Sequence, residues 1–412
     1  MFRGLLLILV FAYLFTQNSY SEWEKANGGK ELPDSTALSA ILTNGNTIIA
    51  ATTKGIYYST NNGEDWLQKN NGLELPIEIN TLGIKGNNYF IGTMDGIFSS
   101  SDNCDSWIKS DNGINSESVY GFLVIGNNIL AATTGGVFVS ANNGNNWTPK
   151  NQGLPEYEPV NCFAVNGSII FAGTDAGVYS STNNGDNWTF KNFQQKVLSM
   201  VIHKNRLYIS GDGAYTGVHL STDNGNSWNE CNTGLDISHS TKYFLLTAGD
   251  SVFAGGYTTG VYVTNDNGKN WLQYNDGLSP YVQGNELMLA ANDKYIFVGS
   301  KGANGFCNLW RNPRNAPKIG VKDIIDDSDE LLNIFPNPVN ENLNCVINLP
   351  EDEIISFSIT DLLGNDILVL KNELILQMNK TISFSMSDYS SGSYYIKLIT
   401  KRGIISKVFA KY

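Results

Sequence analysis

The chain of 412 residues is poor in basic, histidine and cysteine side chains, and each shortage excludes a class of function. Lys and Arg number 27 against 39 Asp and Glu, for a formal net charge of −12, whereas nucleic acids and anionic membranes are bound by clustered Lys and Arg. The three histidines have no Cys or Ser partner at a recognisable spacing. The five cysteines lack the CxxC spacing of zinc sites and redox pairs: Cys104, Cys162, Cys231, Cys307 and Cys345. We therefore expect no nucleic-acid partner, no cofactor and mainly buried free thiols.

Beyond its first residues the chain also has no apolar run near the roughly 20 residues that a transmembrane helix needs. The start is different, because Arg3 precedes an uncharged apolar run from Leu5 to Phe15, and Ser19 and Ser21 are small residues at cleavage-specifying positions. This pattern predicts a secretory signal peptide over residues 1–21. We expect an exported protein without a transmembrane segment.

Tryptophan, in contrast, is regularly spaced. Seven of the eight recur every 40 to 43 residues, at Trp23, Trp66, Trp107, Trp147, Trp188, Trp228 and Trp271. A repeat of this length, built from short apolar runs and Gly/Asn turns, is typical of a β-propeller, in which each repeat forms one four-stranded blade. The sequence predicts an all-β fold with a seven-bladed β-propeller over residues 22–312.

Six repeats end in an octet of the form Ser-x-Asx-x-Gly-x-x-Trp, and these octets resemble the Asp-box, also called the BNR repeat. Ser and Asx side chains can bond their own turn, Gly adopts positive φ, and Trp packs between sheets, which indicates a structural role. This role is assigned to Ser59, Asn61, Gly63, Trp66, Ser100, Asp102, Trp107, Ser140, Asn142, Gly144, Trp147, Ser181, Asn183, Gly185, Trp188, Ser221, Asp223, Gly225, Trp228, Asp266, Gly268 and Trp271. No metal is expected, because the turns lack the acid at the twelfth position of a calcium loop.

Two octets depart from the pattern. Cys104 stands where the others have Gly, and a left-handed conformation costs a non-Gly residue about 1–2 kcal/mol, so we expect a distorted second turn. Thr264 replaces Ser in the last octet.

The last repeat has only three apolar runs before the pattern breaks at Asn312. The segment from Glu22 to Pro33 is similar to the fourth-strand segment from Asp65 to Pro76, and it precedes any first strand. We therefore expect an N-terminal strand to complete the last blade and close the ring, which leaves only short edges exposed.

Residues 313–330 are polar and acidic and form the predicted linker. Alternating apolar residues in 331–412 predict a small Ig-like β-sandwich. Its motifs resemble the C-terminal sorting domain (type A) of the bacterial type IX secretion system, through Pro336, Asn337, Pro338, Gly364, Gly392 and Tyr394. The resemblance implies that the type IX machinery is a partner and that the protein is secreted or attached to the outer cell surface. An ordinary Ig-like adhesive module is the alternative.

In Asp-box families the active or binding cleft lies opposite the boxes, on the face that carries the second-to-third-strand turns and the blade-to-blade loops. We refer to this face as the box-free face. Candidate ligand-binding residues there are Glu156, Tyr157, Tyr215, Tyr257 and Tyr281. Candidate catalytic carboxylates, of which the simpler interpretation is turn formation, are Asp95, Asp175 and Asp212.

Three hypotheses of function follow. The first is a secreted or cell-surface protein that binds a glycan or a protein on the box-free face without catalysis. The second is a glycoside hydrolase that acts on extracellular polysaccharide through a carboxylate pair. The third is a structural role in a surface layer. A sialidase is disfavoured, because that family's cleft needs three arginines and the propeller segment has only Arg206, Arg311 and Arg314.

Overall fold

The computed structural model describes residues 23–26, 32, 37–114, 117–211, 217–237, 242–256, 259–275, 277–278, 286–301, 309–314, 332–348, 354–360, 366–371, 381–400 and 403–411. Every regular element in these ranges is a strand. The predicted signal peptide and most of the predicted linker lie outside them. No helix in the described part of the chain is long and apolar enough to cross a bilayer.

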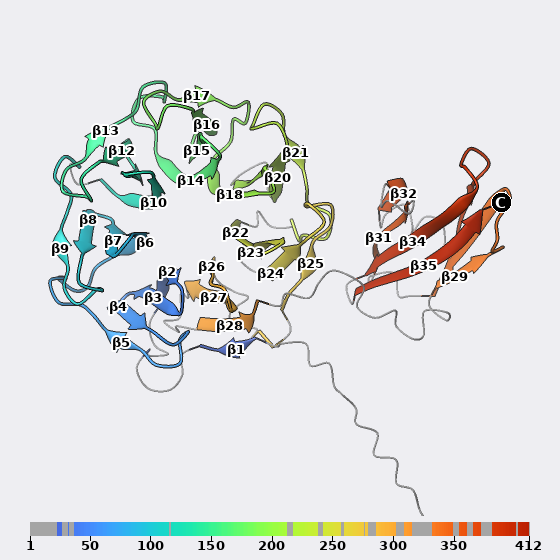
Figure 1. Ribbon diagram of the computed structural model, residues 1–412, viewed down its shortest axis with the longest axis horizontal. Coiled ribbons are helices and arrows are strands. Elements are labelled where there is room, and N and C mark those ends of the chain that lie inside the picture. Colours follow the sequence, from blue (N-terminus) through green and yellow to red (C-terminus); the bar gives the residue numbers. More distant parts are fainter. Residues whose placement is uncertain are drawn as a thin grey trace, which may run out of the picture.

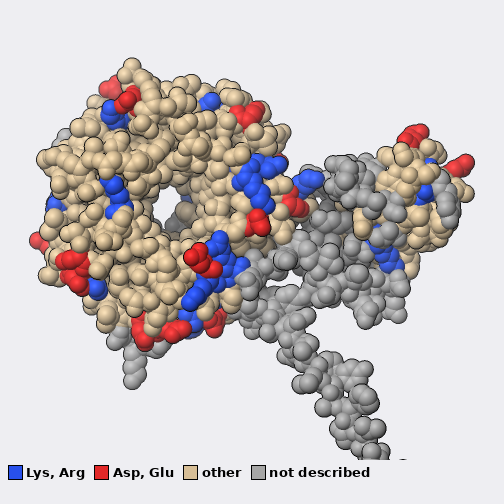
Figure 2. All heavy atoms as spheres, in the orientation of Figure 1, with Lys and Arg blue, Asp and Glu red and all other residues tan. Residues whose placement is uncertain are grey.

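Residues 23–314 form a ring of sheets around a central opening (Figures 1 and 2). As far as the chain is described, this ring holds seven four-stranded antiparallel sheets. From the centre outward they are β2 (Leu38–Asn44), β3 (Thr47–Thr52), β4 (Gly55–Ser59) and β5 (Leu67–Gln68); β6 (Ile79–Lys85), β7 (Asn88–Thr93), β8 (Gly96–Ser100) and β9 (Ile108–Lys109); β10 (Val119–Ile125), β11 (Asn128–Thr133), β12 (Gly136–Ser140) and β13 (Thr148–Pro149); β14 (Val160–Asn166), β15 (Ile169–Thr174), β16 (Val178–Ser181) and β17 (Thr189–Phe190); β18 (Val197–His203), β19 (Arg206–Gly211), β20 (Val218–Ser221) and β21 (Asn229–Glu230); β22 (Tyr243–Ala248), β23 (Ser251–Gly256), β24 (Gly260–Thr264) and β25 (Leu272–Gln273); and β26 (Glu286–Ala291), β27 (Tyr295–Lys301), β28 (Leu309–Pro313) and β1 (Glu24–Lys25).

The last sheet takes its outer strand from the start of the chain. Glu24 pairs with Arg311 and Lys25 with Trp310, which confirms the predicted exchange of an N-terminal strand. At the centre, the innermost strand of each sheet contacts that of the next, and β2 contacts β26. The ring is therefore closed both at its rim and at its centre.

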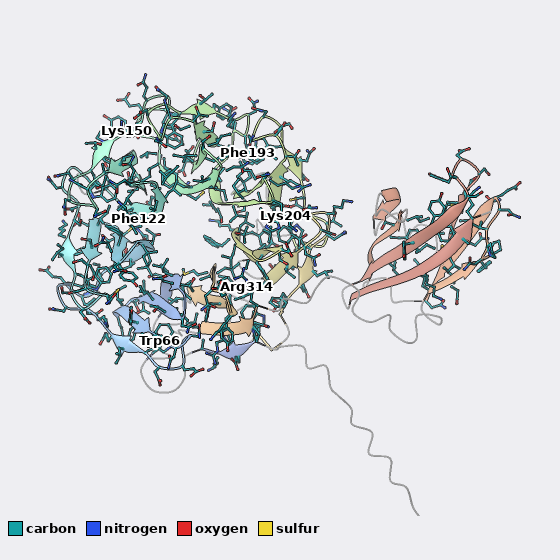
Figure 3. The ribbon with its side chains drawn as sticks, viewed as in Figure 1. Trp66, Phe122, Lys150, Phe193, Lys204 and Arg314 are labelled. Carbon is teal, nitrogen blue, oxygen red and sulfur yellow. The ribbon has the colours of Figure 1, made fainter. Side chains whose placement is uncertain are left out.

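Apolar side chains from facing sheets form the core of the ring. The second strand of each sheet is almost entirely buried, because both of its faces pack against neighbouring sheets. Phe122, on β10, lies 5.9 Å from the ring of Phe90 and 6.5 Å from that of Trp147, at the junction of two sheets (Figure 3). Such aromatic contacts add to the stabilisation that burial of apolar area provides.

Residues 332–411 form two further antiparallel sheets. One contains β29 (Leu332–Phe335), β30 (Asn342–Ile347) and β33 (Thr381–Ser385); the other contains β32 (Asp366–Lys371), β31 (Ile354–Thr360), β34 (Gly392–Thr400) and β35 (Gly403–Lys411). Side chains from both sheets share one buried cluster that includes Leu343, Cys345, Phe357, Ile396 and Phe409. This unit therefore has its own core.

Candidate functional site

The six octets have the same hydrogen bonds. In each, the Ser or Thr hydroxyl accepts a bond from the N–H four residues later at 2.8–3.1 Å and donates to the Asx Oδ1 at 2.7–2.9 Å. That oxygen accepts from a second N–H at 2.9–3.0 Å. These side chains bond their own turns.

The tryptophan of each octet joins its sheet to the preceding one. The indole Nε1–H donates to a carbonyl just after the fourth strand of the preceding sheet, at 2.7–3.0 Å. Trp23 makes the same bond to Tyr274 at 2.7 Å. Seven evenly spaced tryptophans therefore join the sheets around the ring, which gives a physical reason for their period.

The expected distortion at Cys104 is wrong. Its φ is 67°, in the left-handed region, and its N–H still donates to Ser100 at 3.0 Å, as in the other octets. The turn keeps its shape because the thiol is fully buried against the neighbouring sheet junction, where apolar packing offsets the backbone cost.

The described cysteines Cys104, Cys162, Cys231 and Cys345 are free, and Cys307 lies outside the described residues. Burial raises the pKa of the Cys104, Cys231 and Cys345 thiols to about 12. A thiol with so high a pKa is a poor nucleophile, because the thiolate is the reactive form.

The octets lie on the same face as the first-to-second-strand turns. Asn62, in the first octet, donates its N–H to Asn46 in the β2–β3 turn at 3.0 Å, and its side-chain oxygen accepts from Asn292 after β26 at 2.7 Å. The second-to-third-strand turns and the connections between sheets then belong to the opposite, box-free face, since alternate strands run in opposite directions.

The three arginines discussed above do not converge on the box-free face. Arg206 begins β19 at the first-to-second-strand turn, and Arg314 bonds the carbonyl of Asn292 at 3.0 Å on that same octet side. Arg311 lies on β28 beside the N-terminal strand. Arg206 and Arg314 thus lie on the side opposite the expected cleft.

Four of the predicted site residues on the box-free face are described. Asp95 follows β7 and Asp175 follows β15, whereas Glu156 and Tyr157 lie between β13 and β14. Tyr157 is 83% exposed and has a φ of 57°. The other four lie outside the described residues: Asp212, Tyr215, Tyr257 and Tyr281.

The two described carboxylates belong to sheets that are not neighbours in the ring, since the sheet of β10 to β13 lies between them. Each faces a lysine instead. Lys109 lies 3.7 Å from Asp95, and Lys196 lies 2.9 Å from Asp175. Asn161 also donates to Asp175 at 2.9 Å. The structure therefore holds each carboxylate in its own exposed polar cluster.

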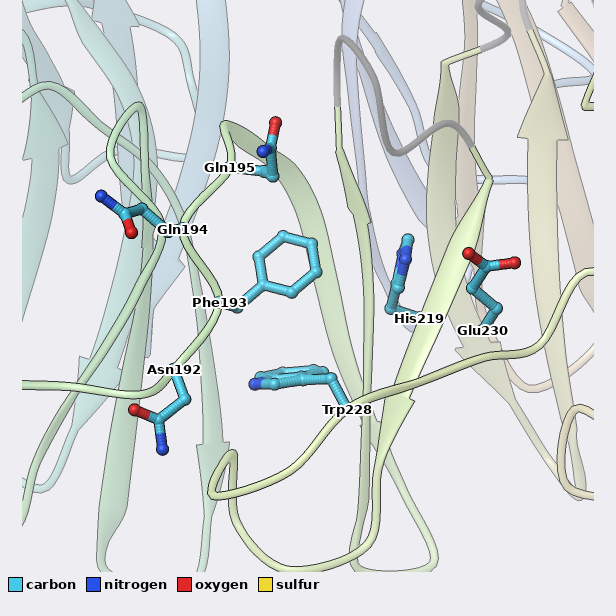
Figure 4. A pocket seen from close by; sticks show the side chains of 7 residues that line it. All are labelled: Asn192, Phe193, Gln194, Gln195, His219, Trp228 and Glu230. Carbon is cyan, nitrogen blue, oxygen red and sulfur yellow. The ribbon is translucent and has the colours of Figure 1, made fainter.

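Sequence reasoning missed an open cleft of about 600 Å³ between the fourth and fifth sheets (Figure 4). It is lined from the β17–β18 connection by Asn192, Phe193, Gln194 and Gln195. The other side is lined by His219 on β20, Glu230 on β21 and Trp228, which directly precedes β21. The Phe193 ring lies 5.1 Å from that of His219 and 5.3 Å from that of Trp228.

The sequence does contain a signal for this cleft, because the connection between the fourth and fifth sheets is shorter than the connections between other sheets. Residues 191–196 join β17 to β18, whereas the corresponding connections run over 69–78, 110–118, 150–159, 231–242 and 274–285. Only a strand-by-strand alignment of the repeats reveals the difference, because the spacing of the tryptophans hardly changes.

The cleft contains a neutral histidine and no cluster of metal ligands among the described residues. Burial lowers the pKa of His219, so the ring is neutral near pH 7. No group of three or more His, Cys, Asp and Glu side chains suited to a metal ion occurs in the described ranges. The cleft thus presents aromatic, amide and carboxylate groups.

Comparison with known families identifies both parts of the chain. A model of the secretion system C-terminal sorting domain matches residues 333–411, and a model of the DUF6242 beta propeller domain matches residues 114–310. The chain therefore contains a β-propeller domain and a C-terminal sorting domain of the type IX secretion system. This sorting domain directs export, followed by attachment to the cell surface or release.

Solved structures agree on the fold. YCF48 bound to D1 peptide is 15% identical with a TM-score of 0.56, over 72% of this chain and 98% of that one. YCF48 from Cyanidioschyzon merolae is 15% identical with a TM-score of 0.52, over 71% and 98%. A GH74 xyloglucanase from Xanthomonas campestris is 12% identical with a TM-score of 0.54, over 72% and 54%. No curated protein sequence matches the chain significantly.

Proposed function

We propose that the protein is a secreted or cell-surface binding protein that holds a glycan or a protein on the box-free face and does not catalyse a reaction. The observation that carries this proposal is the difference between the two faces of the ring in the exposure and hydrogen bonding of their side chains. The octet side chains are bonded within their own turns, whereas the box-free face presents exposed residues such as Tyr157. An open aromatic cleft lies between the fourth and fifth sheets.

The proposal includes the architecture that supports the site. We infer a seven-bladed propeller of Asp-box repeats over residues 22–312, a linker over 313–330 and an Ig-like sorting domain over 331–412. Seven four-stranded sheets, six octets with the same bonds and two C-terminal sheets around one core support it. We also infer that a signal peptide over residues 1–21 is removed during export.

Within the C-terminal unit, the predicted sorting residues Asn337 and Tyr394 hold strands together. Asn337 accepts a bond from the N–H of Ala410 at 3.0 Å, and the Tyr394 ring stacks on Phe409 with centroids 5.6 Å apart. We propose that the type IX machinery recognises the surface that these residues support. Gly364 lies outside the described residues.

A glycoside hydrolase is the second candidate, because a GH74 xyloglucanase shares the fold. Catalysis would need two carboxyl groups about 5–5.5 Å apart for retention or about 6.5–9.5 Å apart for inversion. Asp95 and Asp175 come from non-adjacent sheets. Each carboxylate forms an ion pair with a lysine and does not pair with the other carboxylate. Binding is therefore the favoured proposal.

The test applies the purified mature chain to a glycan array and, in parallel, assays reducing ends released from the same polysaccharides. The proposal expects retention on a glycan, or on a protein partner in a matched screen, without release. Release that disappears in the double variant Asp95→Asn and Asp175→Asn would establish the hydrolase instead. The single variant Glu74→Gln, on the same face, is the matched control.

A further inference from the structure

Four connections between sheets cover the next tryptophan in the same way. The N–H groups of Trp107, Trp147, Trp188 and Trp271 donate to main-chain carbonyls of the preceding connection at 2.8–2.9 Å, and the acceptors are Asn71, Asn112, Gln152 and Thr233. In each case the connection lies across the backbone of the tryptophan.

The residue after each acceptor is a glycine, and its contact with the tryptophan explains why. Gly72, Gly113, Gly153 and Gly234 have φ between 87° and 97°. A Cβ on any of them would lie 2.0–2.1 Å from the tryptophan carbonyl oxygen. Only glycine fits at this distance. An apolar residue follows and packs into the same junction, as Leu73, Ile114, Leu154 and Leu235 do.

The connection before Trp228 lacks this segment. Lys191 still accepts the indole bond at 2.8 Å, but the chain then turns inward, and the Phe193 carbonyl accepts from Val178 at 3.1 Å. In four other sheets an Asn side chain accepts a bond from the matching N–H, for example Asn151 from Val137 at 2.7 Å. Within the described chain, no backbone carbonyl accepts from the Trp228 N–H.

Because the connection is short, Trp228 is more exposed than the equivalent tryptophans. The other six regularly spaced tryptophans are at most 4% exposed, whereas Trp228 is only partly buried. The cleft opens at this point, with Phe193 and His219 as aromatic walls and Gln194, Gln195 and Glu230 around them (Figure 4). The chain's own glycine-containing segment thus occupies the matching place at four other junctions.

We propose that this cleft binds an extended peptide segment of a partner protein that carries glycine followed by an apolar residue. The carbonyl before the glycine accepts from the Trp228 N–H, and the glycine lies over the Trp228 carbonyl. The apolar side chain packs against the rings of Phe193 and Trp228. The Glu230 carboxylate disfavours acidic residues beside that segment. This inference rests on the proposed binding function and narrows its partner to a peptide bound at the junction of the fourth and fifth sheets.

The probe is a labelled peptide with the chain's own sequence at 151–155, Asn-Gln-Gly-Leu-Pro, acetylated and amidated at its ends. Binding to the mature chain is measured by fluorescence anisotropy. We expect saturable binding that weakens at least about tenfold when the peptide's glycine is replaced by alanine, because the added Cβ meets the Trp228 carbonyl; tenfold corresponds to about 1.4 kcal/mol.

Two protein variants remove the cleft. In the first, residues 191–196 are replaced by the sequence of residues 150–159, which supplies the missing segment in cis. The second variant is His219→Tyr. The third strands of three other sheets have Tyr at the equivalent position, namely Tyr57, Tyr179 and Tyr262, and the larger ring fills space beside Phe193. Both should fold and lose peptide binding. Exchanging residues 150–159 for the sequence of 69–78, another long connection, is the control that retains binding.

Absence of binding to the unaltered chain, equal binding of the glycine and alanine peptides, or full binding to both variants would overturn the inference. Displacement of the peptide by neutral oligosaccharides alone would also overturn it, in favour of a sugar site. If glycan or protein retention on the array persists in the cleft-filled variants while the peptide fails to bind, the proposed function stands without this inference.

Discussion

The Arg311 guanidinium donates to the Glu24 carboxylate at 2.7 Å and joins two strands whose residues are 287 positions apart in the sequence. The same guanidinium donates to the Asn62 carbonyl at 2.8 Å and lies over the Tyr295 ring at 4.7 Å. Arg311 thus connects the N-terminal strand, the last sheet and the first octet. Its planar fork suits several simultaneous partners.

Arg311→Ala should lower the free energy of unfolding by about 2 kcal/mol, because one charged hydrogen bond and one bond to a carbonyl are lost from a largely buried side chain. Glu24→Gln should cost less than about 1 kcal/mol, since Glu24 is half exposed and the pair is screened there. Urea unfolding followed by fluorescence measures both. Equal stability of the Arg311→Ala variant and the unaltered chain would contradict the role given to Arg311.

Deletion of residues 22–30 removes β1 and should destabilise the whole propeller rather than one sheet. The ring loses its closing strand, and Trp23 no longer packs on Tyr274. We expect a single urea transition at a lower midpoint. A separate early transition, with the remaining sheets unaffected, would show that the ring does not depend on this strand.

Gly153→Ala should lower stability by more than about 2 kcal/mol. Its φ is 93°, and the new Cβ would lie 2.1 Å from the Trp188 carbonyl oxygen. Gly167→Ala is the matched control, because Gly167 has a φ of 60° and open space around it, so only the backbone cost of about 1–2 kcal/mol applies. A thermal or urea comparison that found equal losses would remove the steric argument.

Asp102 and Asp223 should make stability depend on acid pH. Bonds from Ser106 to Asp102 and from Ser227 to Asp223 lower the pKa of each carboxyl to about 2. Because an unfolded Asp has a pKa near 3.9, the two carboxylates stabilise the fold above about pH 4, and this contribution is lost as the pH falls towards 2.

The double variant Asp102→Asn and Asp223→Asn should flatten this dependence, since Asn61, Asn142 and Asn183 make the same turn bonds without charge. Urea midpoints between pH 2 and 5 measure the effect, with Glu74→Gln as a control for a general loss of charge. An unchanged slope in the double variant would show that other carboxyls dominate.

Deletion of residues 333–411 should leave the propeller inside the cell envelope, because the sorting domain directs the last export step. Fractionation with an antibody against the propeller measures this. A reporter fused to residues 331–412, behind a signal peptide, should reach the surface or the medium. A reporter that stays inside while the full chain is exported would contradict a self-sufficient sorting domain.

The order of strands could be predicted from the sequence because each strand is bounded by a local signal. Asn-Gly and Gly-Gly pairs mark the turns, and the period of the tryptophans fixes the sheets, so the exchange of the N-terminal strand followed from an incomplete last repeat. The bonds within the octets followed from the chemistry of Ser and Asx.

The site was less predictable. Asp95 and Asp175 were selected for lying on one face, but position on a face does not fix the distance between sheets, and both carboxylates pair with lysines. The cleft at Trp228 arises from residues that a connection lacks, and motif analysis looks for residues that are present. Cys104 was misjudged because a local rule for positive φ omits the packing around the thiol.

The most direct test of the proposed binding function is to incubate the purified mature chain with extracellular polysaccharides and with surface proteins, and to measure retention and bond cleavage in the same samples. We expect retention of at least one glycan or protein and no release of reducing sugar, and the double variant Asp95→Asn and Asp175→Asn should retain the ligand equally well. Release of sugar that those two substitutions abolish would contradict the proposed function.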